Sequence, residues 1–178
     1  MRLKSLVLGT LLGGLAAFAW STISWEVIGW HEKTMLGFRN DEEVAAVISS
    51  HTVESGTYLL PYRSPPDAKL IERMQRGPIV VAAVRRNGFE SMARAMTIQV
   101  LSLFAAAFLL TWLLLHNREL SYPRRVLFLG AVGFAASVIV DLPNWNWWGF
   151  SGSFTAVNLA DNTLTWLLAG LVIAKVAK

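Results

Sequence analysis

The chain has 178 residues, of which 54% are hydrophobic and only 16% charged, and its mean hydropathy is positive. Soluble domains carry about 25% charged residues, so this composition excludes an ordinary water-soluble domain and indicates an integral membrane protein. The absence of cysteine excludes disulfides and thiolate chemistry, and the net charge of +4 does not indicate nucleic-acid binding, because many of the cations stand at the ends of apolar runs.

The first apolar run, residues 5–23, follows a basic start and predicts the first membrane helix. A basic start, an apolar core and the small residues "AFA" at 17–19 also fit a secretory signal peptide. Apolar character continues beyond that point, and small residues recur with helical spacing at Gly9, Gly13 and Ala17, which suits close helix packing. These features favour a retained helix over residues 1–24, with cleavage as the alternative.

Residues 25–93 have an ordinary soluble composition and predict a small α+β insert between the first two membrane helices. The expected elements are an amphipathic continuation of the first helix, a helix at 41–50 capped by Asn40 and Glu43, a strand at 56–62, a helix at 67–76 and a strand at 78–86. An insert of this size buries little apolar surface, so we expect it to lean on the bilayer or on a partner.

Three further apolar runs within residues 94–178 predict membrane helices at about 95–116, 125–142 and 154–175. The third helix is shorter than the roughly 20 residues that a span requires, so we expect its polar and aromatic flanks to reach the interfaces. Pro143 is expected to end it. The predicted fold class is a membrane all-α bundle of four transmembrane helices with an α+β insert between helices one and two.

Basic residues collect on one side of this topology. They lie at the N-terminus, between helices two and three, and at the C-terminus: Arg2, Lys4, Arg118, Arg124, Arg125, Lys175 and Lys178. The opposite connection, residues 141–153, contains no lysine or arginine. Positively charged connections stay in the cytoplasm, so both termini are predicted to be cytoplasmic and residues 25–93 extracytoplasmic.

Tryptophans gather near the predicted extracytoplasmic interface. Three stand in the stretch "DLPNWNWWGF" at 141–150 and two follow the first helix: Trp145, Trp147, Trp148, Trp25 and Trp30. Tryptophan settles at headgroup depth because one end of its ring is apolar and the other donates a hydrogen bond. We interpret these residues as interfacial anchors, with a dedicated ligand platform as the alternative.

Polar residues inside the apolar segments form a candidate site. One face of the fourth helix carries Thr155, Asn158, Asn162, Thr165 and Ala169. Asp161 stands beside this face, and a lone carboxylate at that depth costs on the order of 2.5–3.5 kcal/mol unless it finds a partner. We expect Arg94, or Gln99 one turn further along the second helix, to supply that partner, with Asp141 as a competing acid.

Two interpretations of these polar residues stay open. The structural one is a buried clasp that joins helices two, three and four through side-chain hydrogen bonds. The functional one is an outer-leaflet pocket for a lipid headgroup, with Asp161 or Asp141 as proton acceptor. The residues of that pocket are Arg94, Gln99, Asn158, Asp161 and Asn162.

His31 is a further catalytic candidate, beside Asp141 and Asp161. No nucleophile elbow accompanies it, and the three histidines do not have the spacing of metal ligands, so we expect no metal and no other cofactor. The alternative interpretation is an interfacial histidine that bonds to backbone or to lipid phosphate.

Several segments resemble uncharacterised bacterial four-helix membrane proteins over most of residues 20–115. The resemblance is carried by Ser24–Trp25, Trp30–His31, Thr34, Phe38, "DEEVAAVI", "SGTYLLP" and "GPIVVAAVR". It implies a four-helix topology in a bacterial inner membrane and no catalytic activity. The plan is similar to claudin-like proteins in topology alone, because this chain lacks their cysteine pair.

The sequence therefore predicts an inner-membrane accessory or interaction protein. Its insert and tryptophan-rich loop are expected to contact a membrane-protein partner or a second copy, since small-residue faces on helices one and three suit association and no complete catalytic constellation is visible. The alternative is an outer-leaflet lipid-binding or lipid-modifying enzyme that uses a cluster of His31, Arg94, Asp141 and Asp161. A transporter is the third possibility.

Overall fold

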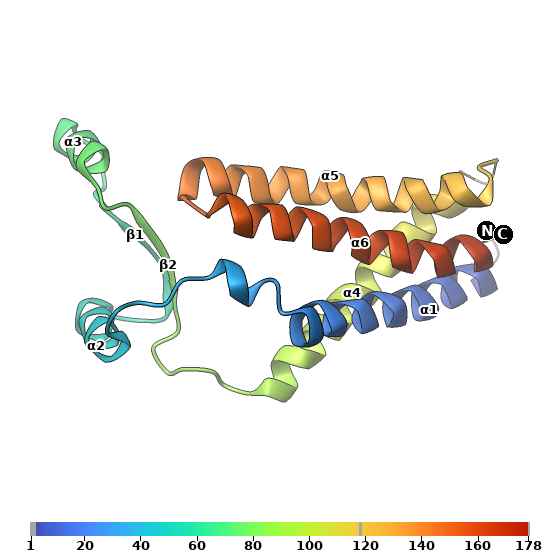
Figure 1. Ribbon diagram of the computed structural model, residues 1–178, viewed down its shortest axis with the longest axis horizontal. Helices are drawn as coiled ribbons and strands as arrows, with labels where there is room; N and C mark the ends of the chain where they lie inside the picture. The colour runs from blue at the N-terminus through green and yellow to red at the C-terminus, as the bar shows by residue number, and fades with distance from the viewer. Residues whose placement is uncertain (1–2, 118, 178) are drawn as a thin grey trace.

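The computed structural model describes residues 3–117 and 119–177, and this part of the chain forms four long helices (Figure 1). They are α1 (Leu3–Thr22), which continues as the π-helical turn η1 (Ile23–Ile28), α4 (Met92–Leu115), α5 (Tyr122–Trp148) and α6 (Gly152–Val176). Each is long and apolar enough to cross a membrane, which indicates an integral membrane protein. The predicted fold class is confirmed: a bundle of four apolar helices with a small α/β insert between the first two.

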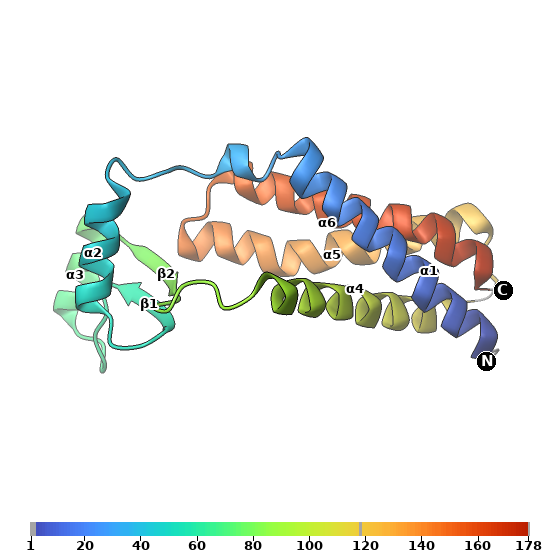
Figure 2. The ribbon, with the colours of Figure 1, turned by 90° about the horizontal axis from the view of Figure 1, so that it is seen from below.

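The four helices pack in the order α4–α1–α6–α5. Helix α6 packs along α5 and α1, and α1 packs along α4, whereas α4 contacts α5 and α6 only sparsely. Both chain ends lie at one end of the bundle and the insert lies at the other, here called the insert end (Figures 1 and 2). The buried residues of α4 all lie between Ala107 and Leu115, so its first half, residues 92–106, is not buried by the described chain.

Glycines allow the helices to approach closely. A Cβ atom on Gly13 of α1 would lie 2.5 Å from Cγ1 of Ile173 on α6. A Cβ atom on Gly133 of α5 would lie 2.9 Å from the backbone oxygen of Asn162 on α6. The small-residue faces of helices one and three therefore pack within this chain. They no longer argue for association with another protein, as the sequence suggested.

The predicted end of the third membrane helix is wrong. Helix α5 continues past Pro143 to Trp148, because a proline inside a helix removes only one backbone donor, and the helix ends instead at Gly149, whose φ of 75° suits glycine. The third helix is therefore 27 residues long, and Trp145, Trp147 and Trp148 belong to its last turns instead of a loop. The first helical segment continues past residue 24, as expected, and is capped by Gly29, at a φ of 61°.

The elements of the insert lie close to their predicted positions. They are α2 (Asp41–His51), β1 (Gly56–Leu60), α3 (Ala68–Arg76) and β2 (Val80–Val84), preceded by a short 3-10 turn, η2 (Glu32–Thr34). The strands form an antiparallel hairpin in which Tyr58 pairs with Ala82. The predicted cap at Asn40 is confirmed, because its Oδ1 accepts a hydrogen bond of 3.2 Å from the backbone N–H of Glu43.

The insert has almost no core of its own. Only Thr52, Pro61 and Leu70 are buried among residues 32–91. The guanidinium of Arg86, which follows β2, donates hydrogen bonds of 2.7 and 3.1 Å to backbone carbonyls near the end of α2, so polar contacts join the sheet to this helix. Large apolar side chains stay exposed at Leu36, Phe38, Val47, Val53, Leu60, Tyr62, Ile71 and Ile79. The insert projects from the end of the bundle (Figure 2).

Candidate functional site

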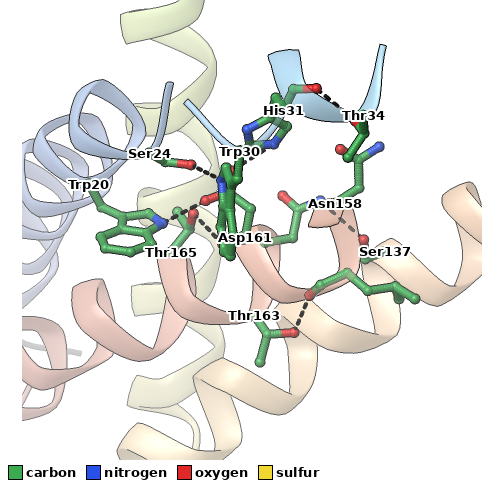
Figure 3. Close-up of polar contacts among 12 residues, drawn as sticks. Trp20, Ser24, Trp30, His31, Thr34, Ser137, Asn158, Asp161, Thr163 and Thr165 are labelled. Atoms are coloured by element: carbon green, nitrogen blue, oxygen red, sulfur yellow. Dashed lines mark hydrogen bonds and ion pairs between the residues drawn. The ribbon is translucent and has the colours of Figure 1, made fainter. Parts of the chain in front are cut away.

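The chain folds back onto α6 directly after the first helical segment. The turn at Gly29 places Trp30 and His31 beside α6, where Asp161 projects from the helix (Figure 3). We call Trp20, Ser24, Trp25, Trp30, His31 and Asp161 the His31 cluster. It joins α1, the start of the insert and α6 at the insert end of the bundle.

Asp161 is held by helix one and not by helix two. Its Oδ1 accepts a hydrogen bond of 2.7 Å from the indole Nε1 of Trp20, and its Oδ2 lies 3.6 Å from Nε2 of His31. The predicted partner Arg94 instead pairs with Glu90, one turn earlier and at an exposed position. This expectation was wrong because α1 lies between α4 and α6, so that the start of α4 does not reach Asp161.

His31 is buried, with 2% of its surface exposed. Its ring stacks on the indole of Trp25, with centroids 4.1 Å apart, and meets the edge of Trp30 at 5.9 Å. Trp30 is fixed in turn by a hydrogen bond of 2.8 Å from its Nε1 to Oγ of Ser24. The Nδ1 atom of His31 is buried without a hydrogen-bond partner in the described chain. The alternative interpretation expected the ring to bond to backbone or to lipid phosphate, and no bond to backbone forms in the described chain.

The contact with Asp161 sets the chemistry of the imidazole. At 3.6 Å the contact is longer than a hydrogen bond, but the negative charge still favours the tautomer that carries hydrogen on Nε2. In that tautomer Nδ1 carries the lone pair and can accept a proton or a hydrogen bond. A carboxylate that orients an imidazole in this way is the arrangement found in general-base catalysis.

Burial lowers the pKa of His31 below its ordinary value of 6.5, and the charge of Asp161 offsets only part of this effect. As the pH falls below 6.5, the unfolded chain takes up a proton before the folded chain does. The free energy of unfolding is therefore highest above pH 6.5, where His31 is neutral in both states, and it decreases as the pH falls from 6.5 towards the lowered pKa of the folded state.

We expect the melting temperature in mild detergent to fall as the pH is lowered from about 7 to 5, because the folded state resists protonation of His31. Thermal melts of the purified protein across this range measure the effect. His31→Gln should flatten the profile, whereas His51→Gln, at an exposed position, should leave it unchanged. An unaltered profile for His31→Gln would show that other groups cause the dependence.

A second polar network joins α5 and α6. The Oγ–H of Ser137 donates to Asp141, Nδ2 of Asn158 donates to Asp141 at 3.2 Å, and Nδ2 of Asn162 donates to Ser137 at 3.1 Å. The predicted clasp therefore forms between helices three and four, without helix two. No lysine or arginine of the described chain pairs with Asp141, which is 8% exposed.

The predicted pocket residues do not line one cavity. Asn158 and Asn162 face α5, Asp161 faces α1, Arg94 lies at the exposed start of α4, and Gln99 lines a groove between α1 and α4. Sequence reasoning also missed Trp20 as a partner of Asp161. No spacing pattern signals that contact, because the two residues are 141 positions apart.

Within residues 3–117 and 119–177, no three His, Cys, Asp or Glu side chains come together as ligands for a metal ion. The His31 cluster is thus an Asp–His pair enclosed by indole rings, with one ring nitrogen unpaired. Comparisons with protein-family models, curated proteins and solved structures find no match for this chain.

Proposed function

We propose that this protein is a membrane interaction subunit whose insert is completed by a membrane-protein partner. The observation that carries the proposal is the missing core of the insert, where only three of the residues 32–91 are buried. A folded segment needs buried apolar surface to offset the loss of conformational entropy. A partner that covers the exposed apolar side chains supplies that surface.

The exposed residues belong to every part of the insert. Leu36 is 96% exposed, Val53 90% and Ile71 58%. The hairpin of β1 and β2 has no third strand in the described chain, so both outer edges are open, and an isolated two-stranded hairpin is marginal in water. A partner can therefore bind by packing on the apolar residues and by adding a strand to an edge.

We expect the amides of β1, β2, α2 and α3 to exchange hydrogen about tenfold or more slowly in native membranes than in the purified chain. Exchange pulses on membranes and on detergent-solubilised protein, read by mass spectrometry, measure this difference. Val53→Lys should remove the protection, because it places a charge on the apolar surface. Gln75→Lys, at an exposed polar position of α3, should not.

Protection of the purified chain at low concentration would contradict the proposal, because the insert would then be stable alone. Protection that rises with the concentration of purified protein would show that the partner is a second copy of this chain and not another membrane protein. Lack of protection in native membranes would show that no partner covers the insert there.

For the orientation, we propose cytoplasmic termini and an extracytoplasmic insert. Lys4, Arg124, Arg125 and Lys175 lie towards the ends of the long helices opposite the insert, and the connection 149–151 at the insert end carries no lysine or arginine. The further basic residues Arg2, Arg118 and Lys178 lie outside the described residues. A reporter that is active only outside the cytoplasm, fused after Asn87, should be active; activity of a cytoplasmic reporter there would reverse the orientation.

A second candidate function is lipid binding or lipid modification, favoured by the unpaired Nδ1 of His31. Nδ1 would act as the base towards a headgroup hydroxyl, with Asp161 orienting the ring. Arg94 and Asp141 take no part, because they lie in other contacts. If the protein modifies a lipid, deleting the gene and substituting His31→Gln should change the same lipid species in membrane extracts; unchanged extracts would exclude lipid modification.

A further inference from the structure

A groove separates α1 from α4 in the insert half of the bundle. Its volume is about 400 Å³, and its walls include Phe18, Ser21, Trp25, Glu26, Met96 and Gln99. Both helices are long enough to span a membrane, and Glu26 belongs to the last turn of the first span. The groove therefore runs from headgroup depth at Glu26 to the acyl region at Phe18, about 12 Å deeper at 1.5 Å per residue.

Two groups at the shallow end of this groove attract cations. Glu26 supplies a carboxylate, and Trp25 supplies an indole face, to which ammonium groups bind through cation–π attraction. The indole is held in place because it stacks on the ring of His31 with an interplanar angle of 8°. None of the described lining residues is lysine or arginine, so an anionic headgroup would meet a carboxylate with no cation beside it.

The remaining walls suit the rest of a phospholipid. Phe18 and Met96 offer apolar surface to an acyl chain. The side chains of Ser21 and Gln99 make no hydrogen bond with any described residue, so they can donate to phosphate and ester oxygens. We propose that this groove binds a phospholipid whose headgroup carries an ammonium group. The site is separate from the insert, so this inference does not depend on the proposed partner.

The test uses the full chain in lipid discs made from equal parts of phosphatidylethanolamine and phosphatidylglycerol. Native mass spectrometry after mild release should show retained phosphatidylethanolamine in excess over phosphatidylglycerol. Glu26→Gln should lower that ratio about two- to fivefold, the effect of losing one partly solvated charge pair. Glu32→Gln, which removes the same charge outside the groove, should leave the ratio unchanged.

Measurements with other lipids and with the two variants show which group of the groove recognises the headgroup. Retention of phosphatidylcholine as well supports recognition by the Trp25 face, because its trimethylammonium group has no N–H to donate to Glu26. Preference for phosphatidylglycerol would overturn the proposal, as would equal effects of Glu26→Gln and Glu32→Gln. Since both substitutions keep side-chain size and leave Trp25 on His31, both variants should fold, and a melting curve of each verifies this.

Discussion

Substituting Gly133→Val is expected to lower the free energy of unfolding by about 1–3 kcal/mol, the typical cost of overpacking. A Cβ at this position would lie 2.6 Å from Cδ1 of Trp166 and 2.9 Å from the backbone oxygen of Asn162. The indole can rotate, but the backbone of α6 can move away only by separating α6 from α5. Because α5 and α6 pack along their length, such a shift also disturbs the hydrogen bonds of Asn158 and Asn162.

Denaturation in mixed micelles, followed by tryptophan fluorescence, measures this change. Ala135→Val is the matched control, because it adds methyl groups on the exposed face of the same helix two residues away. We expect the control to stay within about 0.5 kcal/mol of the unsubstituted protein. Equal effects of the two substitutions would show that α5 and α6 do not pack closely at Gly133.

Substituting Asp161→Leu is expected to destabilise the bundle by about 1–3 kcal/mol, because it leaves the indole N–H of Trp20 without an acceptor and removes the negative charge beside Nε2 of His31. Leucine is cheaper than aspartate to place in a membrane, which works against this loss. The loss of these two contacts should outweigh that gain, since the packing around Trp20 and His31 holds both side chains in place. Asp161→Asn should be milder, because its amide oxygen can still accept from Trp20.

A comparison with Arg94→Leu distinguishes the observed partners of Asp161, Trp20 and His31, from the partner expected from sequence, Arg94. Arg94 and Glu90 have side chains that are 65% and 68% exposed, so their ion pair should contribute no more than about 0.5 kcal/mol. Unfolding curves of the two variants, measured together, should therefore differ clearly. Similar destabilisation by both would mean that Arg94 is the true partner of Asp161.

The sequence predicted local structure well because the signals are local. Length and apolar content identified four membrane helices, and the cap at Asn40 marked the start of α2. The end of the third helix was misjudged because Pro143 is a strong breaker in isolation, while Gly149 supplies the actual C-terminal cap.

The candidate site was predicted only in part. The sequence identified Asp161 and His31 as polar residues that need explanation, but it joined Asp161 to Arg94. Their actual contact depends on the order in which the helices pack, and composition carries no information about that order. Trp20 was missed for the same reason: as a tryptophan near the end of a membrane helix it has the features of an interfacial residue, and only its place opposite α6 makes it a donor to Asp161.

The order α4–α1–α6–α5 also constrains how the protein is assembled during synthesis. Of the four helices, α1 comes first in the chain and packs between α4 and α6, and α6 comes last. Gly9 and Gly14 of α1 lie against α4, the second of these helices in the chain. Gly13 lies against Ile173 of α6, so this part of α1 has its final neighbour only when α6 has been made. The carboxylate of Asp161 belongs to α6, and its contacts with Trp20 and His31 join the first of the four helical segments to the last.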